Sequence, residues 1–302
     1  MKTLTPWPKS PFTLAICLGA ALLIPPAARS QNLYATSHSG NIFSFTPGGT
    51  PGTVASGLSL PSGLAFNNAG DLFEADQGSG NIYEFTPGGT RTTFASGLAQ
   101  PNGLAFDSSG DLYVSQLGTG PVNTGLITKI TPGGAASTFA SGLNPEGTLI
   151  FNSTGSLLMS DIETGNIDAF TASGVESTFL SGVFAHGLAF NSAGNLFFSA
   201  NGGSFGVIYQ YTTGGVQSLF ASGLSENVAG LAFNNAGTLF VADTASGKIF
   251  DYTPNGTQNL FASGLNNPYA LTFAVPEPST FALLTLSSAA FLLRRRCRAS
   301  TL

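Results

Sequence analysis

The stretch that decides the fold runs from Gly63 to Ser96 and reads GLAFNNAGDLFEADQGSGNIYEFTPGGTRTTFAS. It holds four short runs rich in Leu, Phe, Ile, Tyr and Thr, residues that favour the pleated surface of a strand. Asn-Ala-Gly, Ser-Gly and Pro-Gly-Gly separate the runs and supply the positive φ angles that tight turns require. The stretch therefore predicts four antiparallel strands, named a to d in chain order and joined by three turns.

The same unit recurs along the chain. The tripeptide Ser-Gly-Leu or Ser-Gly-Val occurs six times, at intervals of 40 to 45 residues, beginning at Ser56, Ser96, Ser141, Ser181, Ser222 and Ser263. Repeated four-stranded units of this length are the sequence signature of a β-propeller, in which each unit is one blade. No stretch of residues 31–274 keeps a helical period, so we expect an all-β domain there.

The two ends of this body give the number of blades. It opens on a strand b at Asn32–Ala35 that has no strand a before it, and it closes on a strand a at Tyr269–Phe273 that has no strand b after it. Five complete units and one shared unit make six blades. We expect the C-terminal strand to join the N-terminal blade, because this closes the ring and leaves no blade unpaired.

Residues 1–30 have the pattern of a secretory signal. Lys2 and Lys9 precede an apolar run from Phe12 to Ile24, and Ala-Arg-Ser ends the segment at Ser30. The thirteen residues of the run are fewer than the about 20 that a membrane-spanning helix needs. The sequence therefore predicts export, with cleavage between Ser30 and Gln31.

In residues 275–302 the basic residues follow the apolar run, whereas in residues 1–30 the two lysines precede it. The apolar run over 281–293 is as short as the N-terminal one, but the basic cluster after it would stay on the cytoplasmic side of the membrane. Run and cluster together therefore predict a short hydrophobic transmembrane helix. The residues before and after the run are Pro276, Glu277 and Pro278, and Arg294, Arg295 and Arg296.

This order of Pro-Glu-Pro, apolar helix and arginine cluster resembles the PEP-CTERM sorting signal of Gram-negative bacteria. In that family an exosortase cuts near the Pro-Glu-Pro, and the protein passes to the outer envelope or an exopolysaccharide matrix. The resemblance implies export across the inner membrane, a transient membrane anchor through the C-terminal segment alone, and an exosortase-type processing enzyme as a partner.

The repeated body resembles a second family. The patterns Gly-Leu-Ala-Phe, Gly-Asp-Leu-Tyr-Val and Gly-Asn-Ile are similar to those of NHL-type propellers and their gluconolactonase-like relatives. This resemblance covers nearly the whole body and implies the propeller fold. It is weak for activity, because that architecture carries many functions.

Charge and cysteine content limit the classes of partner. Residues 31–276 hold fourteen acidic residues against three basic ones, a net charge of −11. Because a body this acidic would repel phosphate backbones, we expect no nucleic-acid partner. Both cysteines, Cys17 and Cys297, lie in the flanking segments, and the body therefore has no disulfide.

The repeats also predict two different faces. The span from the strand-a Phe to the strand-b Leu is six residues in each of the five complete blades, and the span that contains the c–d turn is twelve residues in all six. In an up-and-down sheet the a–b and c–d turns lie on the same face. We call it the uniform face, because its turns keep one length. On the opposite, variable face the b–c spans range from 9 to 15 residues, with insertions at Leu117–Gly125 and Asn201–Gly206, and the d–a connections vary too. Variable loops on a rigid scaffold often carry binding. Neutral drift is the alternative, but it should have changed both faces.

The residue just before strand a should ring the mouth of the central channel on the variable face. It differs in every blade: Ser62, Asn102, Glu146, His186, Ala229 and Tyr269. We expect ligand binding at Asn102, Glu146, His186 and Tyr269, and the alternative is a channel mouth that is merely solvated. The gluconolactonase-like resemblance further implies a divalent cation such as calcium on Asn102 and Glu146, although hard cations usually require more than one carboxylate and this ring offers one.

Other residues have structural interpretations. His186 resembles the general base of virginiamycin B lyase-like propellers, but His38 shows no pairing with it. Asp76, Asp161 and Asp243 end strand b, where each is expected to cap its own turn. The repeated Phe residues are expected between blades. The body has no nucleophile elbow, phosphate loop, zinc spacing or paired catalytic carboxylates.

Three functions remain open. The first is an exported, envelope- or matrix-associated binding module without catalytic activity, which holds polysaccharide or an envelope protein on its variable face. The second is a metal-dependent lactonase or esterase of the gluconolactonase-like type. The third is a purely structural envelope protein.

Overall fold

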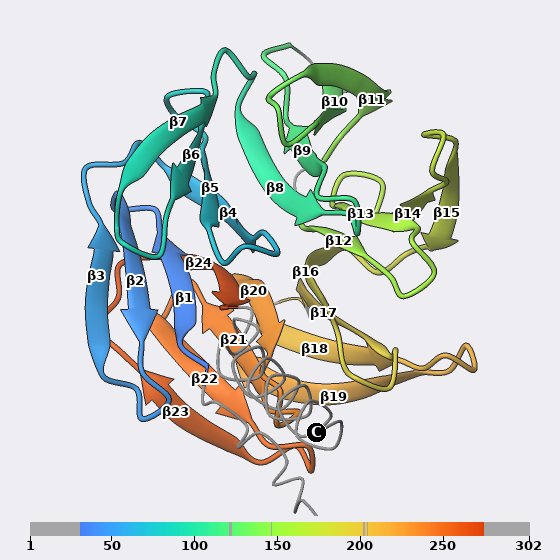
Figure 1. Ribbon diagram of the computed structural model, residues 1–302. Helices are drawn as coiled ribbons and strands as arrows, with labels where there is room; N and C mark the ends of the chain where they lie inside the picture. Colours follow the sequence, from blue (N-terminus) through green and yellow to red (C-terminus); the bar gives the residue numbers. More distant parts are fainter. Residues whose placement is uncertain (1–30, 121–122, 146, 202, 204, 275–302) are drawn as a thin grey trace, which may run out of the picture.

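The fold is a six-bladed β-propeller, as the repeats predict (Figure 1). In the computed structural model, the described residues are 31–120, 123–145, 147–201, 203 and 205–274. They form six four-stranded antiparallel sheets around a central axis, and no helix occurs among them. The predicted signal, the Pro-Glu-Pro segment, the short hydrophobic helix and the arginine cluster all lie outside the described residues. Within the described part, no helix has the length and apolarity needed to cross a membrane.

The strands of each blade are given in order from the channel outward. Blade 1 contains β24 (Pro268–Phe273), β1 (Leu33–Ser37), β2 (Asn41–Phe45) and β3 (Pro51–Ala55). Blade 2 contains β4 (Pro61–Phe66), β5 (Leu72–Asp76), β6 (Asn81–Phe85) and β7 (Arg91–Ala95). Blade 3 contains β8 (Pro101–Phe106), β9 (Leu112–Gln116), β10 (Gly125–Ile130) and β11 (Ala136–Leu143). Blade 4 contains β12 (Leu149–Phe151), β13 (Leu157–Asp161), β14 (Asn166–Phe170) and β15 (Glu176–Leu180). Blade 5 contains β16 (Ala185–Phe190), β17 (Leu196–Asn201), β18 (Gly206–Tyr211) and β19 (Gln217–Leu224). Blade 6 contains β20 (Val228–Phe233), β21 (Leu239–Asp243), β22 (Lys248–Tyr252) and β23 (Gln258–Ala262).

The ring closes as predicted, through the C-terminal strand. The red β24 pairs antiparallel with the blue β1, with Leu33 opposite Phe273 (Figure 1). The Ala274 amide donates to the Asn32 carbonyl at 3.4 Å and extends the ladder. Blade 1 is therefore built from both ends of the body.

Side chains and glycines together form the turns of the uniform face. In the a–b turn of blade 2, Asn67 Oδ1 accepts hydrogen bonds from the amides of Ala69 and Asp71, both at 2.9 Å. Gly70 takes a φ of 87° in this turn, a value that suits glycine because it lacks a Cβ. Equivalent bonds to Asp107, Asn152, Asn191 and Asn234 shape the a–b turns of blades 3 to 6. Local chemistry thus explains why these turns have one length.

Aromatic rings fill the spaces between blades. Phe73 of strand b stands between Phe94 of its own blade and Phe106 of the next, with ring centroids 5.0 and 4.9 Å away in edge-to-face geometry. Such contacts add about 0.5–1.5 kcal/mol to the area that they bury. Tyr113, Phe197 and Phe240 repeat the arrangement in other blades. The repeated Phe residues thus join neighbouring blades, as expected.

A glycine near the start of strand a allows inner strands to touch. A Cβ on Gly187 would lie 1.9 Å from the Ala229 carbonyl oxygen, and one on Gly63 would lie 2.2 Å from that of Asn102. No side chain fits at such distances, so the repeated glycine reflects the close approach of two backbones.

Hydroxyl groups of strand b tie these inner strands together. The Ser199 hydroxyl accepts from the Gly187 amide at 2.8 Å and donates to the Val228 carbonyl of the next blade at 2.9 Å. Thr36, Ser115 and Ser160 likewise accept from an amide in, or directly before, the inner strand of their own blades. The mouth of the channel is therefore held by bonds within and between blades.

Candidate binding face and central channel

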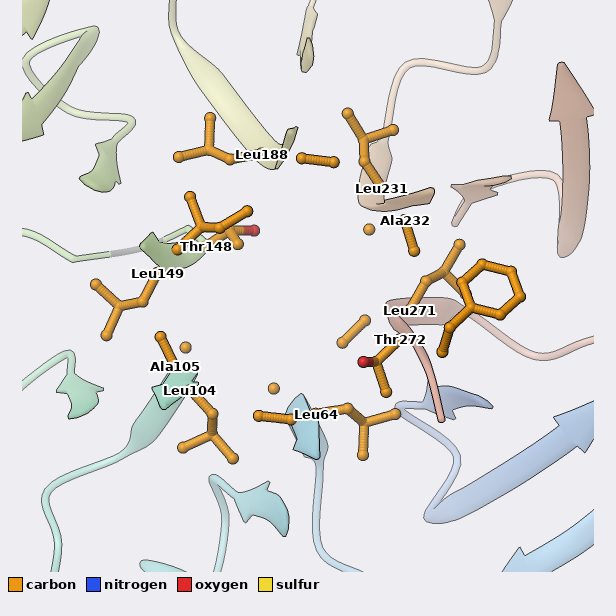
Figure 2. A pocket seen from close by; sticks show the side chains of 18 of the residues that line it. Leu64, Leu104, Ala105, Thr148, Leu149, Leu188, Leu231, Ala232, Leu271 and Thr272 are labelled. Carbon is orange, nitrogen blue, oxygen red and sulfur yellow. The ribbon is translucent and has the colours of Figure 1, made fainter. Parts of the chain in front are cut away.

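The six inner strands enclose a cavity of about 580 Å³ along the propeller axis. Figure 2 shows one leucine from each blade encircling the open centre: Leu64, Leu104, Leu149, Leu188, Leu231 and Leu271. Alanine and glycine complete much of the wall, and Gln31 lies at the end beside the a–b turns. The side chains along the channel wall are therefore mainly apolar.

Asn102 lies in the mouth on the variable face, but its carboxamide is already bonded. Its Oδ1 accepts a hydrogen bond of 2.5 Å from the Ser62 hydroxyl, and its Nδ2 donates to the Pro145 carbonyl at 3.5 Å. Asn102 and Ser62 are 3% and 1% exposed, respectively. These bonds link blades 2, 3 and 4, so Asn102 has a structural role at the mouth in addition to any role in ligand binding.

His186 lines the mouth from blade 5. Its Nε2 lies 3.3 Å from Nδ2 of Asn201, the last residue of β17. Burial lowers the pKa of His186, which favours a neutral ring at neutral pH. With Asn201 as donor, Nε2 is the acceptor. The pair presents an imidazole and an exposed carboxamide side by side.

Tyr269 lines the mouth from blade 1 and stacks on His38, with ring centroids 4.4 Å apart and an interplanar angle of 32°. The His38 Nε2 is buried without a hydrogen-bond partner, and burial lowers the pKa of this ring. The contact therefore pairs the tyrosine with a neutral, largely apolar imidazole face.

Three of the four predicted ligand-binding residues thus lie around one mouth, each on a different blade. Glu146, the fourth residue and the carboxylate of the predicted cation site, lies outside the described residues. Among the residues that the structure describes, His, Cys, Asp and Glu side chains form no group of three or more that could hold a metal ion. The cation site on Asn102 and Glu146 stays a prediction.

The three aspartates that end strand b cap turns, as expected. Asp76 accepts from the Ser79 amide at 3.3 Å, Asp161 from the Thr164 amide at 3.0 Å, and Asp243 from the Ser246 amide at 3.4 Å. Asp76 also accepts from Ser59 in the preceding d–a connection at 2.9 Å. Asp243 does the same with Ser225. These carboxylates therefore brace the variable face from within.

Among the described residues, left-handed backbone strain at non-glycine positions is confined to the variable face. Every described non-glycine residue with a positive φ lies there: Leu60 (57°), Gln100 (57°), Asn123 (63°), Phe184 (46°) and Asn267 (50°). Four of them directly precede a strand a, and Asn123 lies in the b–c loop of blade 3. A left-handed conformation costs an L-residue about 1–2 kcal/mol, and bulky residues such as Leu and Phe adopt it rarely. No sequence pattern predicted these positions.

Large exposed apolar side chains occur on the same face, and two of them belong to strained residues. Leu60 is 47% exposed, Phe184 is 50% exposed and Phe205 is 45% exposed. The Phe184 ring packs over Gly165, where a Cβ would meet it at 2.9 Å. The other exposed large apolar residues of the described chain lie in or just before outer strands: Val175, Phe179, Val216, Leu219 and Leu260. Exposed carboxamides share the variable face: Gln100, Asn123, Asn201, Asn266 and Asn267.

One buried acid, Glu74, was also not predicted. Glu74 of β5 is 0% exposed, and neither carboxyl oxygen has a hydrogen bond of normal geometry. Burial, and then the neighbouring Asp76, raise the pKa of Glu74 well above its usual range, whereas Arg91 and the Ser62 amide act in the opposite direction. The protonated form is therefore favoured. The signal was available, because the other blades carry an apolar residue at this position: Ala35, Val114, Met159, Phe198 and Val241.

A family model of the PEP-CTERM protein-sorting motif matches residues 274–296. This confirms the resemblance of the C-terminal segment to that signal. The motif implies export and transient membrane anchoring before processing by an exosortase. No curated protein matches the chain.

Solved structures share the propeller. A chain in the crystal structure of the nidogen–laminin complex matches with a TM-score of 0.70 at 17% identity, covering 82% of this chain and 99% of that chain. Virginiamycin B lyase from Staphylococcus aureus matches with a TM-score of 0.59 at 17% identity, covering 81% and 88%. A gluconolactonase from Xanthomonas campestris matches with a TM-score of 0.62 at 15% identity, covering 80% and 88%. Identities this low establish a common fold and leave function open.

Proposed function

We propose that the mature protein is a non-catalytic binding module that holds a neutral polysaccharide of the cell envelope or its surrounding matrix on the variable face. The observation that carries this proposal is the confinement of left-handed Leu60 and Phe184 to that face, both with half-exposed side chains. Strain of this kind persists where the surrounding structure maintains it, and it clusters at functional sites.

The chemistry of the variable face supports a neutral glycan. Exposed Phe184 and Phe205 offer flat apolar surfaces for the C–H faces of sugar rings, and the neighbouring carboxamides can both donate to and accept from hydroxyl groups. The exposed acids Glu163 and Glu226 outnumber Lys248, the one basic residue among the described residues of this face. An anionic polymer would be repelled by such a body.

The test is electrophoresis of the processed protein in native gels that contain a dissolved neutral or anionic polysaccharide. We expect a neutral glycan to retard the protein. Phe184→Ala and Leu60→Ala should each remove more than about 1 kcal/mol of binding free energy, as truncated anchor residues do.

Leu260→Ala is the matched control, because Leu260 is 57% exposed on the outer strand β23, away from the channel. Its mobility should follow that of the wild type. Unretarded migration in every neutral glycan, or an equal loss in Leu260→Ala, would refute the proposal. An envelope protein recovered in place of a glycan would count against it as well.

A further inference from the structure

Both ends of the body emerge where blade 1 would otherwise have its a–b turn. Ala274 follows β24, which runs from the variable face to the uniform face, and Asn32 precedes β1, which runs back. The other five a–b turns lie at this same level of their blades. The chain therefore enters and leaves the propeller on the uniform face.

Gln31 fixes this exit point with two hydrogen bonds. Its Nε2 donates to the Ala274 carbonyl at 2.7 Å, and its Oε1 accepts from the amide of Asn235, in the a–b turn of blade 6, at 3.2 Å. Gln31 also lines the central cavity. The exit point is therefore held beside the channel and against blade 6.

The distance from this point to the membrane is limited by the chain itself. The sorting motif begins at residue 274, and the predicted membrane-spanning run begins at Phe281. Residues 275–280 span at most about 20 Å when fully extended. The inner strands have three to six residues, and a six-residue strand is about 20 Å long. The uniform face can therefore rest close to the bilayer, and the variable face is about one strand length farther away.

We propose that the uniform face is the membrane-facing surface of the protein before processing, and that the variable face points away from the bilayer. The partner of the uniform face is the lipid surface, which the covalent tether at Ala274 holds against it. This orientation leaves the variable face open while the chain is still anchored. It depends on the sorting motif and not on glycan binding, so either proposal can fail alone.

The body suits a labelling test because its sequence contains no cysteine. Ala236 and Ala245 are both exposed and both belong to blade 6, the first in its a–b turn and the second in its b–c turn. Ala236→Cys and Ala245→Cys would be made in full chains in which Cys17 and Cys297 are replaced by serine. Alanine substitution of Pro276 and Glu277 would hold the chains in the membrane of spheroplasts.

A bulky maleimide–polyethylene glycol should label Ala245→Cys several times faster than Ala236→Cys in the anchored chains. A small maleimide should label both at similar rates, which shows that both thiols are exposed on a folded blade. After release of the body by cleavage, the bulky reagent should also label both alike. Equal rates with the bulky reagent before release would overturn the proposal, as would protection of Ala236→Cys that persists after release.

Discussion

Replacing Glu74 with methionine should make the propeller more stable and less sensitive to pH. The carboxyl group of Glu74 is fully buried, and neither of its oxygens has a normal hydrogen bond. Blade 4 has Met159 at the equivalent position, so a methionine suits this layer of the fold. Leaving a buried polar group unsatisfied costs about 1–3 kcal/mol. Because Glu74→Met removes this penalty, we expect it to raise the free energy of unfolding by a similar amount.

The pH dependence follows from the raised pKa of Glu74. The folded state binds the proton more tightly than the unfolded chain, in which the pKa of a glutamate is about 4.3. The contribution of Glu74 is therefore fully present below that pH and is lost as the pH rises toward the folded-state pKa. Over that interval, the wild type should lose up to about 1.4 kcal/mol per pH unit relative to Glu74→Gln, which cannot ionise.

The assay is urea unfolding from about pH 4, just below the pKa of glutamate in the unfolded chain, to about pH 8. Unfolding is followed by far-ultraviolet circular dichroism, because Trp7, the only tryptophan, lies outside the body. Asp168, whose pKa is raised to about 6 chiefly by burial, gives a loss of the same sign in both proteins, so the difference between them isolates Glu74. Glu163→Gln, at an exposed position, is the control. Parallel stability curves for the wild type and Glu74→Gln would refute the reasoning.

Two further predictions concern the channel. Gly187→Ala would force a Cβ to within 1.9 Å of the Ala229 carbonyl oxygen, and it should lower the free energy of unfolding in urea by at least about 1–3 kcal/mol. Gly214→Ala is the control and should be nearly neutral, because no backbone atom lies near its Cβ. Equal effects of the two substitutions would contradict the close contact between the inner strands. Elemental analysis of processed protein purified without chelator should find neither calcium nor zinc in stoichiometric amount. One ion per chain that disappears in Glu146→Ala would favour a metal-dependent hydrolase over a binding module.

The architecture could be predicted from sequence because each blade repeats local rules. Asn-x-Gly and Pro-Gly-Gly set the turns wherever they occur, and the unmatched strands at Asn32–Ala35 and Tyr269–Phe273 determined how the ring closes. The positions of Asn102, His186 and Tyr269 at one mouth followed from the same register.

The details of the candidate site depend on contacts between blades, which a local pattern does not contain. The Ser62–Asn102 bond and the Ser199 link to Val228 join residues far apart in sequence. The left-handed φ of Leu60 and Phe184 is likewise imposed by packing, since neither residue type favours it. Glu74 was the exception, because comparison of the repeats alone would have shown an acid in an apolar layer.

The closure of blade 1 by β24 also sets the order of events during export. β1 is among the first strands to be made and β24 is the last, so the pairing of Leu33 with Phe273 must wait until almost the whole body has been synthesised and translocated. Until then, β1 presents an unpaired edge, the kind of surface on which chains associate wrongly. The residue that completes the ring precedes the predicted membrane run by only a few positions. Arrival of that run at the bilayer therefore coincides with the moment at which the propeller can first become whole.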